Sequence, residues 1–170
     1  RGTTKVKGAS DLATAIEEAH RFDRKALVEE GILGKEVECA VLEIDGQVRT
    51  SNPGEIIIDK RFDFYDFESK YLDDGTSVQV PANIPPDALK EIQRQAVLAF
   101  TSLGCAGLAR VDFFYQSDDQ IIINELNTMP GFTPTSVFPT LWAEKGVPYP
   151  QIIDELIKGA LTRKNGVLGN

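Results

Sequence analysis

The stretch ARVDFFYQSDDQIIINELN, residues 109–127, contains the pattern that decides the fold. Apolar residues predominate on either side of the polar turn Ser117-Asp118-Asp119. This arrangement predicts two strands, 109–115 and 120–126, which pair as an antiparallel hairpin. The chain is therefore expected to contain a sheet with antiparallel strands.

Four polar side chains lie on the predicted hairpin. Side chains two residues apart on a strand share a face, so Arg110 lies with Asp112, and Glu125 lies with Asn127. Carboxylate and amide oxygens are ligands that suit Mg2+, and an arginine beside them can clamp a phosphoryl group or an oxyanion. A solvated polar hairpin is the alternative, because surface exposure is the usual state of Asp and Glu. The apolar run 121–123 favours a binding site, being too apolar for a solvated edge.

The remaining chain predicts further helices and hairpins. Asp45-Gly46 is a strong hairpin signal, and the segment 59–75 is rich in charge and aromatic residues without periodicity, as functional loops are. We expect strands at 26–28, 36–44, 47–50, 56–58 and 78–80, and helices at 10–22, 85–103, 136–145 and 149–161. Helices and hairpins are interspersed, which indicates the α+β class with a largely antiparallel sheet.

Composition narrows the classes of function. The 170 residues carry a net charge of -8, which argues against nucleic acid as the main partner. No apolar run approaches the ~20 residues that span a bilayer. Cys39 and Cys105 are far apart and are expected to be buried and reduced. His20 is the only histidine, so neither a zinc site nor a Ser-His-Asp triad is expected, and no glycine-rich phosphate-binding fingerprint occurs.

Two blocks of sequence resemble a known family. Arg110-x-Asp112 followed by Asn124-Glu125-Leu126-Asn127-Thr128-Met129-Pro130-Gly131-Phe132-Thr133 is similar to the metal and oxyanion motif of the D-alanine–D-alanine ligases. Tyr65-Asp66-Phe67-Glu68-Ser69-Lys70-Tyr71 looks like their omega-loop. The order and spacing of the blocks match from Lys5-Val6 to Ser136. The resemblance implies the ATP-grasp fold, with flanking helices on the antiparallel sheet.

The resemblance also implies roles for individual residues. Two Mg2+ ions, or Mn2+ as a substitute, would be held by Asp112, Glu125 and Asn127. The oxyanion hole would comprise Arg110 and the Gly131 backbone N–H, and Tyr71 would orient the loop and select the second substrate. The carboxylate of the second D-alanine would bind Lys70 and Ser136. The ATP site would comprise Glu29, Glu30, Gly31, Ile32, Glu36, Phe64 and Asn124.

The implied activity is ATP-dependent ligation of two D-alanines, through a D-alanyl phosphate, for peptidoglycan precursor synthesis in the cytoplasm. We expect residues 1–29 to be a remnant of the central ATP-grasp subdomain and residues 30–170 to be the C-terminal subdomain of a longer, homodimeric enzyme. The piece alone is expected to be inactive. Two alternatives remain: another ATP-grasp ligase, including one that makes D-alanine–D-lactate, and a non-catalytic nucleotide-binding module.

Overall fold

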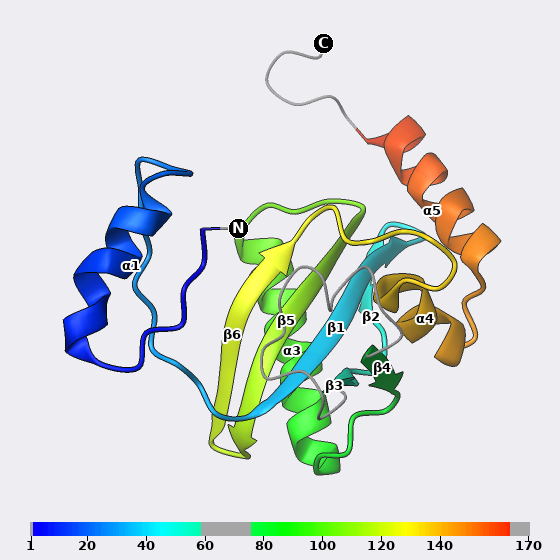
Figure 1. Ribbon diagram of the computed structural model, residues 1–170. Helices are drawn as coiled ribbons and strands as arrows, with labels where there is room; N and C mark the ends of the chain where they lie inside the picture. Colours follow the sequence, from blue (N-terminus) through cyan, green and yellow to red (C-terminus); the bar gives the residue numbers. More distant parts are fainter. Residues whose placement is uncertain (1, 59–75, 164–170) are drawn as a thin grey trace.

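The computed structural model describes residues 2–58 and 76–163, and it consists of a six-stranded antiparallel sheet with helices on both faces (Figure 1). The strand order is β4-β3-β1-β5-β6, and β2 also pairs with β1. The α+β expectation is confirmed. The elements are a 3-10 turn Ala9–Asp11, α1 Leu12–Ala19, β1 Lys35–Ile44, β2 Gln47–Thr50, β3 Gly54–Ile58, β4 Thr76–Gln79, α3 Pro86–Ser102, β5 Leu108–Ser117, β6 Gln120–Asn127, α4 Val137–Glu144 and α5 Tyr149–Thr162.

The first hairpin turns at Asp45-Gly46, as the sequence predicts. Both residues have positive φ, 50° and 72°, which places them in the left-handed region that tight hairpin turns require. Asparagine, aspartate and glycine tolerate this region best. The turn sets the pairing of β1 with β2, from Ile44 opposite Gln47 to Val41 opposite Thr50.

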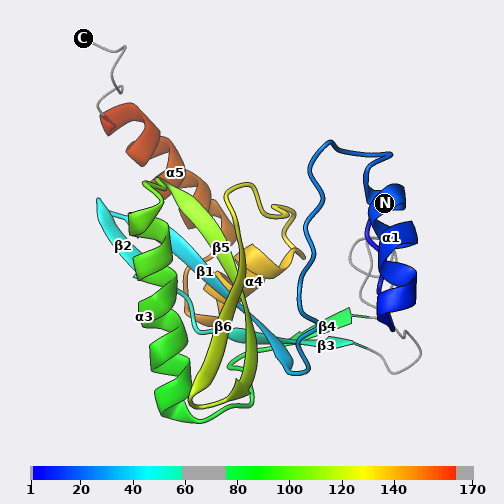
Figure 2. The ribbon, with the colours of Figure 1, turned by 90° about the vertical axis from the view of Figure 1, so that its left-hand side faces the viewer.

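The central strand β1 separates two apolar cores. Its residues Val37, Cys39 and Val41 pack with α3, which runs along one face of the sheet (Figure 2). The alternate residues Ala40, Leu42 and Ile44 pack with α4 and α5 on the other face. Alternation along one strand thus gives both faces a helical cover, as the pleat of a strand requires.

The second core covers only part of its face. Towards the start of β1, the positions on the same face as Ala40 are Glu36 and Glu38, where α4 and α5 no longer contribute apolar side chains. Polar side chains on this part of the sheet therefore lie beside a well-packed core. This is the position of the candidate site.

The predicted strand at 26–28 is wrong. Residues 25–34 have no regular secondary structure, and Leu27 and Val28 are 77% and 66% exposed. A strand needs a partner for its backbone groups, and within the described ranges no strand pairs with this segment. The apolar triplet has β propensity but lacks the tertiary partner that would make it a strand.

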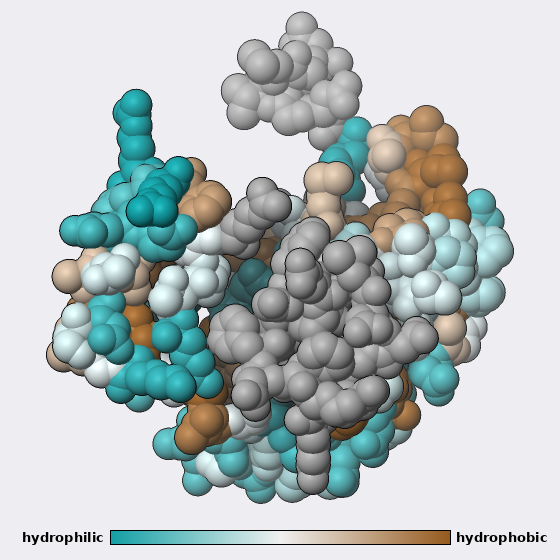
Figure 3. All heavy atoms as spheres, viewed as in Figure 1, coloured by the Kyte–Doolittle hydropathy of each residue, from teal (hydrophilic) through white to brown (hydrophobic). Residues whose placement is uncertain are grey.

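The surface differs between the two ends of the described chain. Figure 3 shows mostly hydrophilic residues around α1 and an apolar strip over α5, where Ile157 and Leu161 are 53% and 81% exposed. In the part of the chain that the structure describes, no helix is long and apolar enough to cross a membrane.

Candidate active site

The hairpin of β5 and β6 brings the four predicted side chains together. In the register of this pair, Arg110 lies opposite Asn127 and Asp112 lies opposite Glu125. Directly opposed residues on an antiparallel pair have Cβ atoms about 4.5–5.5 Å apart and project to the same face. The predicted convergence of Arg110, Asp112, Glu125 and Asn127 is confirmed at the level of strand register.

A β-bulge interrupts the hairpin beside these residues. The register passes from Asp112 opposite Glu125 to Phe113 opposite Ile123, so Asn124 has no partner on β5. Bulges bend a strand and redirect the side chains next to them, and they are common beside active sites. The extra residue of the bulge is Asn124, which is predicted to bind ATP and directly precedes the predicted metal ligand Glu125.

One argument for the site was wrong, although the four side chains do meet in the register of the hairpin. The apolar run 121–123 was expected to be too apolar for a solvated edge. Among the described residues, β6 is an edge strand, and its Ile122 and Ile123 are 37% and 42% exposed. Only Ile121 packs against the core beneath α3.

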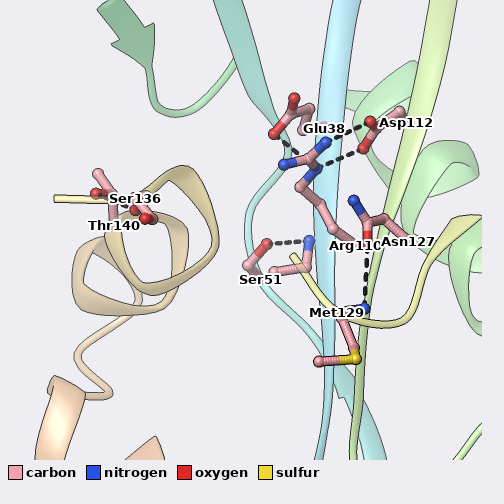
Figure 4. A network of polar contacts seen from close by, with 9 residues as sticks. Glu38, Ser51, Arg110, Asp112, Asn127, Met129, Ser136 and Thr140 are labelled. Carbon is pink, nitrogen blue, oxygen red and sulfur yellow. Dashed lines mark hydrogen bonds and ion pairs between the residues drawn. The ribbon is translucent and has the colours of Figure 1, made fainter. Parts of the chain in front are cut away.

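Arg110 is the centre of a buried ion-pair group (Figure 4). Its Nε donates to Asp112 Oδ1 and its Nη2 donates to Asp112 Oδ2, both at 2.7 Å. Its Nε also lies 3.0 Å from Glu38 Oε2. The Arg110 and Glu38 side chains are each 4% exposed and that of Asp112 is 10% exposed. Burial excludes water from these pairs, which strengthens them and fixes the guanidinium.

Glu38 is a member of this group that the motifs in the sequence did not indicate. This residue lies on β1 opposite Asp112, and Asp112 lies opposite Glu125. A row of polar and charged side chains therefore crosses three neighbouring strands, and we call it the charged row: Glu38, Arg110, Asp112, Glu125 and Asn127. The signal was present: Glu36 and Glu38 alternate with the apolar residues Val37 and Cys39 in a central strand. A carboxylate on a buried strand is rare without a partner cation.

The segment after β6 is a tight loop held by polar contacts. The Asn127 Oδ1 accepts the Met129 N–H at 3.0 Å. A Cβ added to Gly131 would lie 3.0 Å from Ser136 Oγ, so the glycine allows a close approach of the two residues. The Ser136 hydroxyl is bonded within the loop, accepting the Thr133 N–H at 3.0 Å and lying 2.8 Å from Thr133 Oγ1.

Ser136 precedes α4 and lies on the far side of the loop from the charged row. Figure 4 shows it beside Thr140 on the helix, away from the strands that carry Arg110 and Asp112. The loop is anchored at its other end, where the Tyr149 hydroxyl donates to the Phe132 carbonyl at 2.7 Å. The structure therefore places Ser136 next to Gly131, but it separates Ser136 from the charged row.

The other predicted site residues differ in position and in exposure. Glu36 lies on β1 two residues before Glu38 and is half-buried. Ile32 is half-buried in the irregular segment before β1, and Glu29, Glu30 and Gly31 are exposed in the same segment. These residues were expected at the end of a strand that the structure does not have. Phe64, Lys70 and Tyr71 lie outside the described residues, as does the loop 59–75.

The donor set on the charged row fits a hard divalent cation. Asp112, Glu125 and Asn127 offer only oxygen ligands, which Mg2+ and Mn2+ prefer. Within residues 2–58 and 76–163, no three His, Cys, Asp or Glu side chains are grouped closely enough to hold an ion by themselves. The two opposed carboxylates therefore suit a cation that takes its remaining ligands from Asn127, water and a phosphate-bearing substrate.

The cysteines are not part of the site. Both are free, Cys39 being buried and Cys105 half-buried. The predicted burial is therefore confirmed for Cys39 and only partly correct for Cys105. Burial raises the pKa of the Cys39 thiol to about 12. A thiol with this pKa is protonated at neutral pH and is a poor nucleophile.

Comparison with known proteins agrees with this geometry. The family model described as "D-ala D-ala ligase C-terminus" matches residues 1–158. The chain is 51% identical over 170 residues to a D-alanine–D-alanine ligase from Pseudarthrobacter chlorophenolicus, covering 98% of this chain and 44% of that protein.

Solved structures share the fold. The D-alanine–D-alanine ligase from Coxiella burnetii is 35% identical with a TM-score of 0.78, and the match covers 93% of this chain and 40% of that one. The VanG D-Ala:D-Ser ligase from Enterococcus faecalis is 40% identical with a TM-score of 0.78, over 92% of this chain and 45% of that one. The chain spans less than half the length of these relatives. The fold is thus the ATP-grasp fold of these ligases. The chain belongs to the D-alanine–D-alanine ligase family, and it matches the C-terminal part of that family's proteins.

Proposed function

We propose that this chain is the nucleotide- and metal-binding part of an enzyme that uses ATP to join two D-alanine molecules. The family match and the charged row on β1, β5 and β6 support the proposal. The product, D-alanyl-D-alanine, would serve peptidoglycan precursor synthesis. Because the chain spans less than half of its relatives, the reaction belongs to the complete enzyme.

A single observation carries the proposal. Asp112 faces Glu125 and Arg110 faces Asn127 across one hairpin, so two carboxylates, an amide and a guanidinium share a face. A phosphoryl-transfer site needs acidic side chains that hold a cation. It also needs a fixed, positively charged group that stabilises the negative charge developing in the transition state. This row supplies both kinds of group within two cross-strand pairs.

The reaction has two chemical steps. The carboxylate of one D-alanine attacks the γ-phosphorus of ATP, forming an acyl phosphate and releasing ADP. The amine of the second D-alanine then attacks the acyl carbon, and phosphate leaves with the electrons of the C–O bond. Arg110 and the Gly131 N–H would donate to the oxygen that becomes negative in the tetrahedral intermediate.

The metal fits the same face. Asp112, Glu125 and Asn127 would hold Mg2+ or Mn2+, and the cation would neutralise charge on the phosphates of ATP. The family resemblance implies that these residues would hold two ions. The tight loop after Asn127, in which Asn127 Oδ1 accepts the Met129 N–H, connects the acids on β6 with Gly131.

Substrate contacts follow from the family resemblance. ATP would lie between the segment of Glu29, Glu30, Gly31 and Ile32 and the strands, with its ribose at Glu36, its base near Phe64 and its phosphates near Asn124. The second D-alanine would meet Lys70, Tyr71 and Ser136. In this arrangement residues 1–29 belong to the central ATP-grasp subdomain and residues 30–170 to the C-terminal one. The complete enzyme would act as a homodimer in the cytoplasm.

A competition assay tests the function and its alternatives. The complete enzyme is given Mg2+, ATP and D-alanine, with D-serine and D-lactate present, and its products are identified by mass spectrometry. We expect D-alanyl-D-alanine as the main product with one ADP for each dipeptide. A D-serine product would align it with the VanG-like relative, and a D-lactate product with the depsipeptide ligases. Nucleotide binding without any D-alanine-dependent ADP release would contradict a ligase and favour a nucleotide-binding module.

A further inference from the structure

The guanidinium of Arg110 is shared by two buried carboxylates that lie on different strands. Asp112 is on the same strand as Arg110, whereas Glu38 is on β1, directly opposite Asp112. All three side chains are at most 10% exposed. Placing a second carboxylate at such a site is costly unless it has a partner, because buried charge loses its hydration.

The two carboxylates do not bind the guanidinium in the same way. The Nε atom carries one N–H, and this N–H is directed at Asp112 Oδ1 at 2.7 Å. Glu38 Oε2 lies 3.0 Å from the same Nε atom as an ion pair. Asp112 also accepts from Nη2 at 2.7 Å, so both of its oxygens are occupied by Arg110. Glu38 is thus a second acceptor at the atom that Asp112 now engages.

This geometry creates a competition once a cation arrives. A carboxylate oxygen that ligates Mg2+ becomes a weaker acceptor for a guanidinium, because the cation draws electron density from that oxygen and fixes its orientation. Asp112 is the residue that both would need. Without an alternative acceptor, moving Asp112 towards the cation would cost Arg110 two short hydrogen bonds in a buried site.

We infer that Glu38 is a positioning residue that accepts the Arg110 Nε–H when Asp112 turns to the metal. The inference rests on the proposed function, since it requires that Asp112 ligates a cation. Only a hydrogen bond changes partner, and no proton is transferred. Arg110 then keeps its place on the strand, so cation binding and stabilisation of the oxyanion occur together.

Glu55 provides a matched control for Glu38. It is also a buried carboxylate on a strand paired with β1, at 8% exposure against 3%, and it has an ion pair with Lys35 at 2.9 Å. Glu55 bonds to Lys35 and to the Asn83 N–H, and it is not a member of the charged row. Glu38→Gln and Glu55→Gln remove the same charge from two buried sites, and only the first replaces the charged alternative acceptor by a weaker, neutral amide oxygen.

The first test measures Mn2+ affinity of the complete enzyme by electron paramagnetic resonance, with a non-hydrolysable ATP analogue present. We expect Glu38→Gln to weaken Mn2+ binding about tenfold, as loss of a group that supports a metal ligand does. Glu55→Gln is expected to stay within about twofold of the wild type, since in the described part of the chain Glu55 bonds to Lys35 and the Asn83 N–H and to none of the proposed metal ligands. Equal affinities for the two variants would overturn the inference.

A double-mutant cycle separates hydrogen-bond exchange from a simple effect of charge. The Arg110→Gln background lacks the Nε–H that Glu38 is proposed to accept. In this background Glu38→Gln should therefore change the Mn2+ affinity by less than about twofold. A tenfold loss that persists in this background would mean that Glu38 acts through its charge alone, and would overturn the inference.

Two further outcomes keep the test decisive. If circular dichroism shows that Glu38→Gln does not fold, Glu38→Asp replaces it, because this variant keeps the charge and shortens the reach by one methylene. It should also lose Mn2+ affinity, and wild-type affinity would count against the exchange. If the wild-type enzyme itself binds no Mn2+, the proposed function fails as well, whereas normal wild-type binding with an unchanged Glu38→Gln variant removes only the role of Glu38.

Discussion

Arg110 combines two requirements that usually conflict. It is nearly fully buried, which favours a fixed guanidinium, and it faces acids that a cation would need. A buried arginine with two carboxylates is weak support for stability on its own, because desolvation offsets much of the attraction. The proposed chemistry gives a better explanation of its position at the centre of the charged row.

Replacing this guanidinium should affect turnover more than nucleotide binding. We expect Arg110→Gln in the complete enzyme to lower kcat about 10²- to 10³-fold, the usual effect of losing one oxyanion donor. The KM for ATP should change only a few-fold, because Arg110 is proposed to act on charge that develops during the reaction. Steady-state kinetics, scaled by the folded fraction, measure both.

The control for Arg110→Gln is Arg94→Gln. Arg94 also forms an ion pair with a carboxylate, that of Glu91 at 2.7 Å, but its side chain is 62% exposed on α3. Exposed pairs contribute little, so kcat and stability should remain close to wild type. An Arg110→Gln variant with wild-type kcat would exclude an oxyanion role for this residue.

Cys39 gives a prediction that does not depend on the function. Because burial raises its pKa to about 12, its thiolate fraction at pH 8 is on the order of a thousandfold smaller than that of an ordinary thiol. We expect an aromatic disulfide reagent to modify one cysteine of the native chain, Cys105, and both after unfolding in urea. Rapid modification of both in the native state would contradict the buried position of Cys39.

Residue types and spacing were enough to find most of the charged row. Arg110, Asp112, Glu125 and Asn127 could be assigned to one face because strand alternation and a hairpin turn are local signals. Glu38 was missed because its contact depends on which strand pairs with β5, a tertiary fact. The bulge at Asn124 was missed for a related reason: register shifts depend on the packing of both strands.

At the scale of elements, α5 is tied to the first hairpin by one buried carboxylate. Glu155 on α5 accepts the Asp45 N–H at 3.0 Å and the Lys158 Nζ at 2.9 Å. The bond from the Asp45 backbone and that from Lys158 together lower the pKa of Glu155. The contact connects the C-terminal helix with a turn 110 residues earlier in the chain.

Removing this charge should weaken the fold in a pH-dependent way. A carboxyl group with a lowered folded pKa stabilises the protein above its unfolded pKa of about 4.3, and the stabilisation is lost as the pH falls through the folded pKa. We expect Glu155→Gln to lower the free energy of unfolding by about 1 kcal/mol at pH 7, and by less at pH 3. Urea denaturation at both pH values measures this difference. An equal loss at both would mean that the charge of Glu155 is not involved.

The contact between β3 and α4 depends on a glycine. A Cβ on Gly54 would lie 2.5 Å from Leu141 Cδ2 and 2.9 Å from Val78 Cγ1. Gly54→Ala should therefore destabilise the protein by about 1–3 kcal/mol, as overpacking of a core does. Gly159→Ala on α5 is the matched control: no atom lies within 4 Å of the added Cβ, so helix propensity should raise stability by about 0.5–1 kcal/mol. Thermal unfolding that gives both variants the same sign of change would contradict this packing.

Elements with strong local signals were predicted well. The hairpin at Asp45-Gly46, the helix now bounded as Pro86–Ser102 and the two C-terminal helices all lie within a few residues of their expected bounds. The strand at 26–28 failed because three apolar residues satisfy a local pattern without having a partner. Sequence patterns predict which segments can form an element, and neighbouring strands decide whether they do.

At the scale of the whole molecule, one face of the sheet is divided between packing and chemistry. Apolar residues of β1 from Ala40 onward pack against α4 and α5, and Glu36 and Glu38 precede them on the same face. A rigid core next to the charged row holds the site residues in register, which preorganisation for catalysis requires. This division lies in the segment that matches the C-terminal part of the D-alanine–D-alanine ligase family.

The central claim is that a divalent cation binds where Asp112, Glu125 and Asn127 meet. Its most direct test is anomalous diffraction at the manganese edge from crystals of the complete enzyme grown with Mn2+ and a non-hydrolysable ATP analogue. The account predicts an anomalous peak about 2.1–2.3 Å from oxygens of Asp112 and Glu125, in the range of carboxylate–metal distances. A nucleotide whose manganese is held elsewhere, with Asp112 still closed on Arg110, would contradict it.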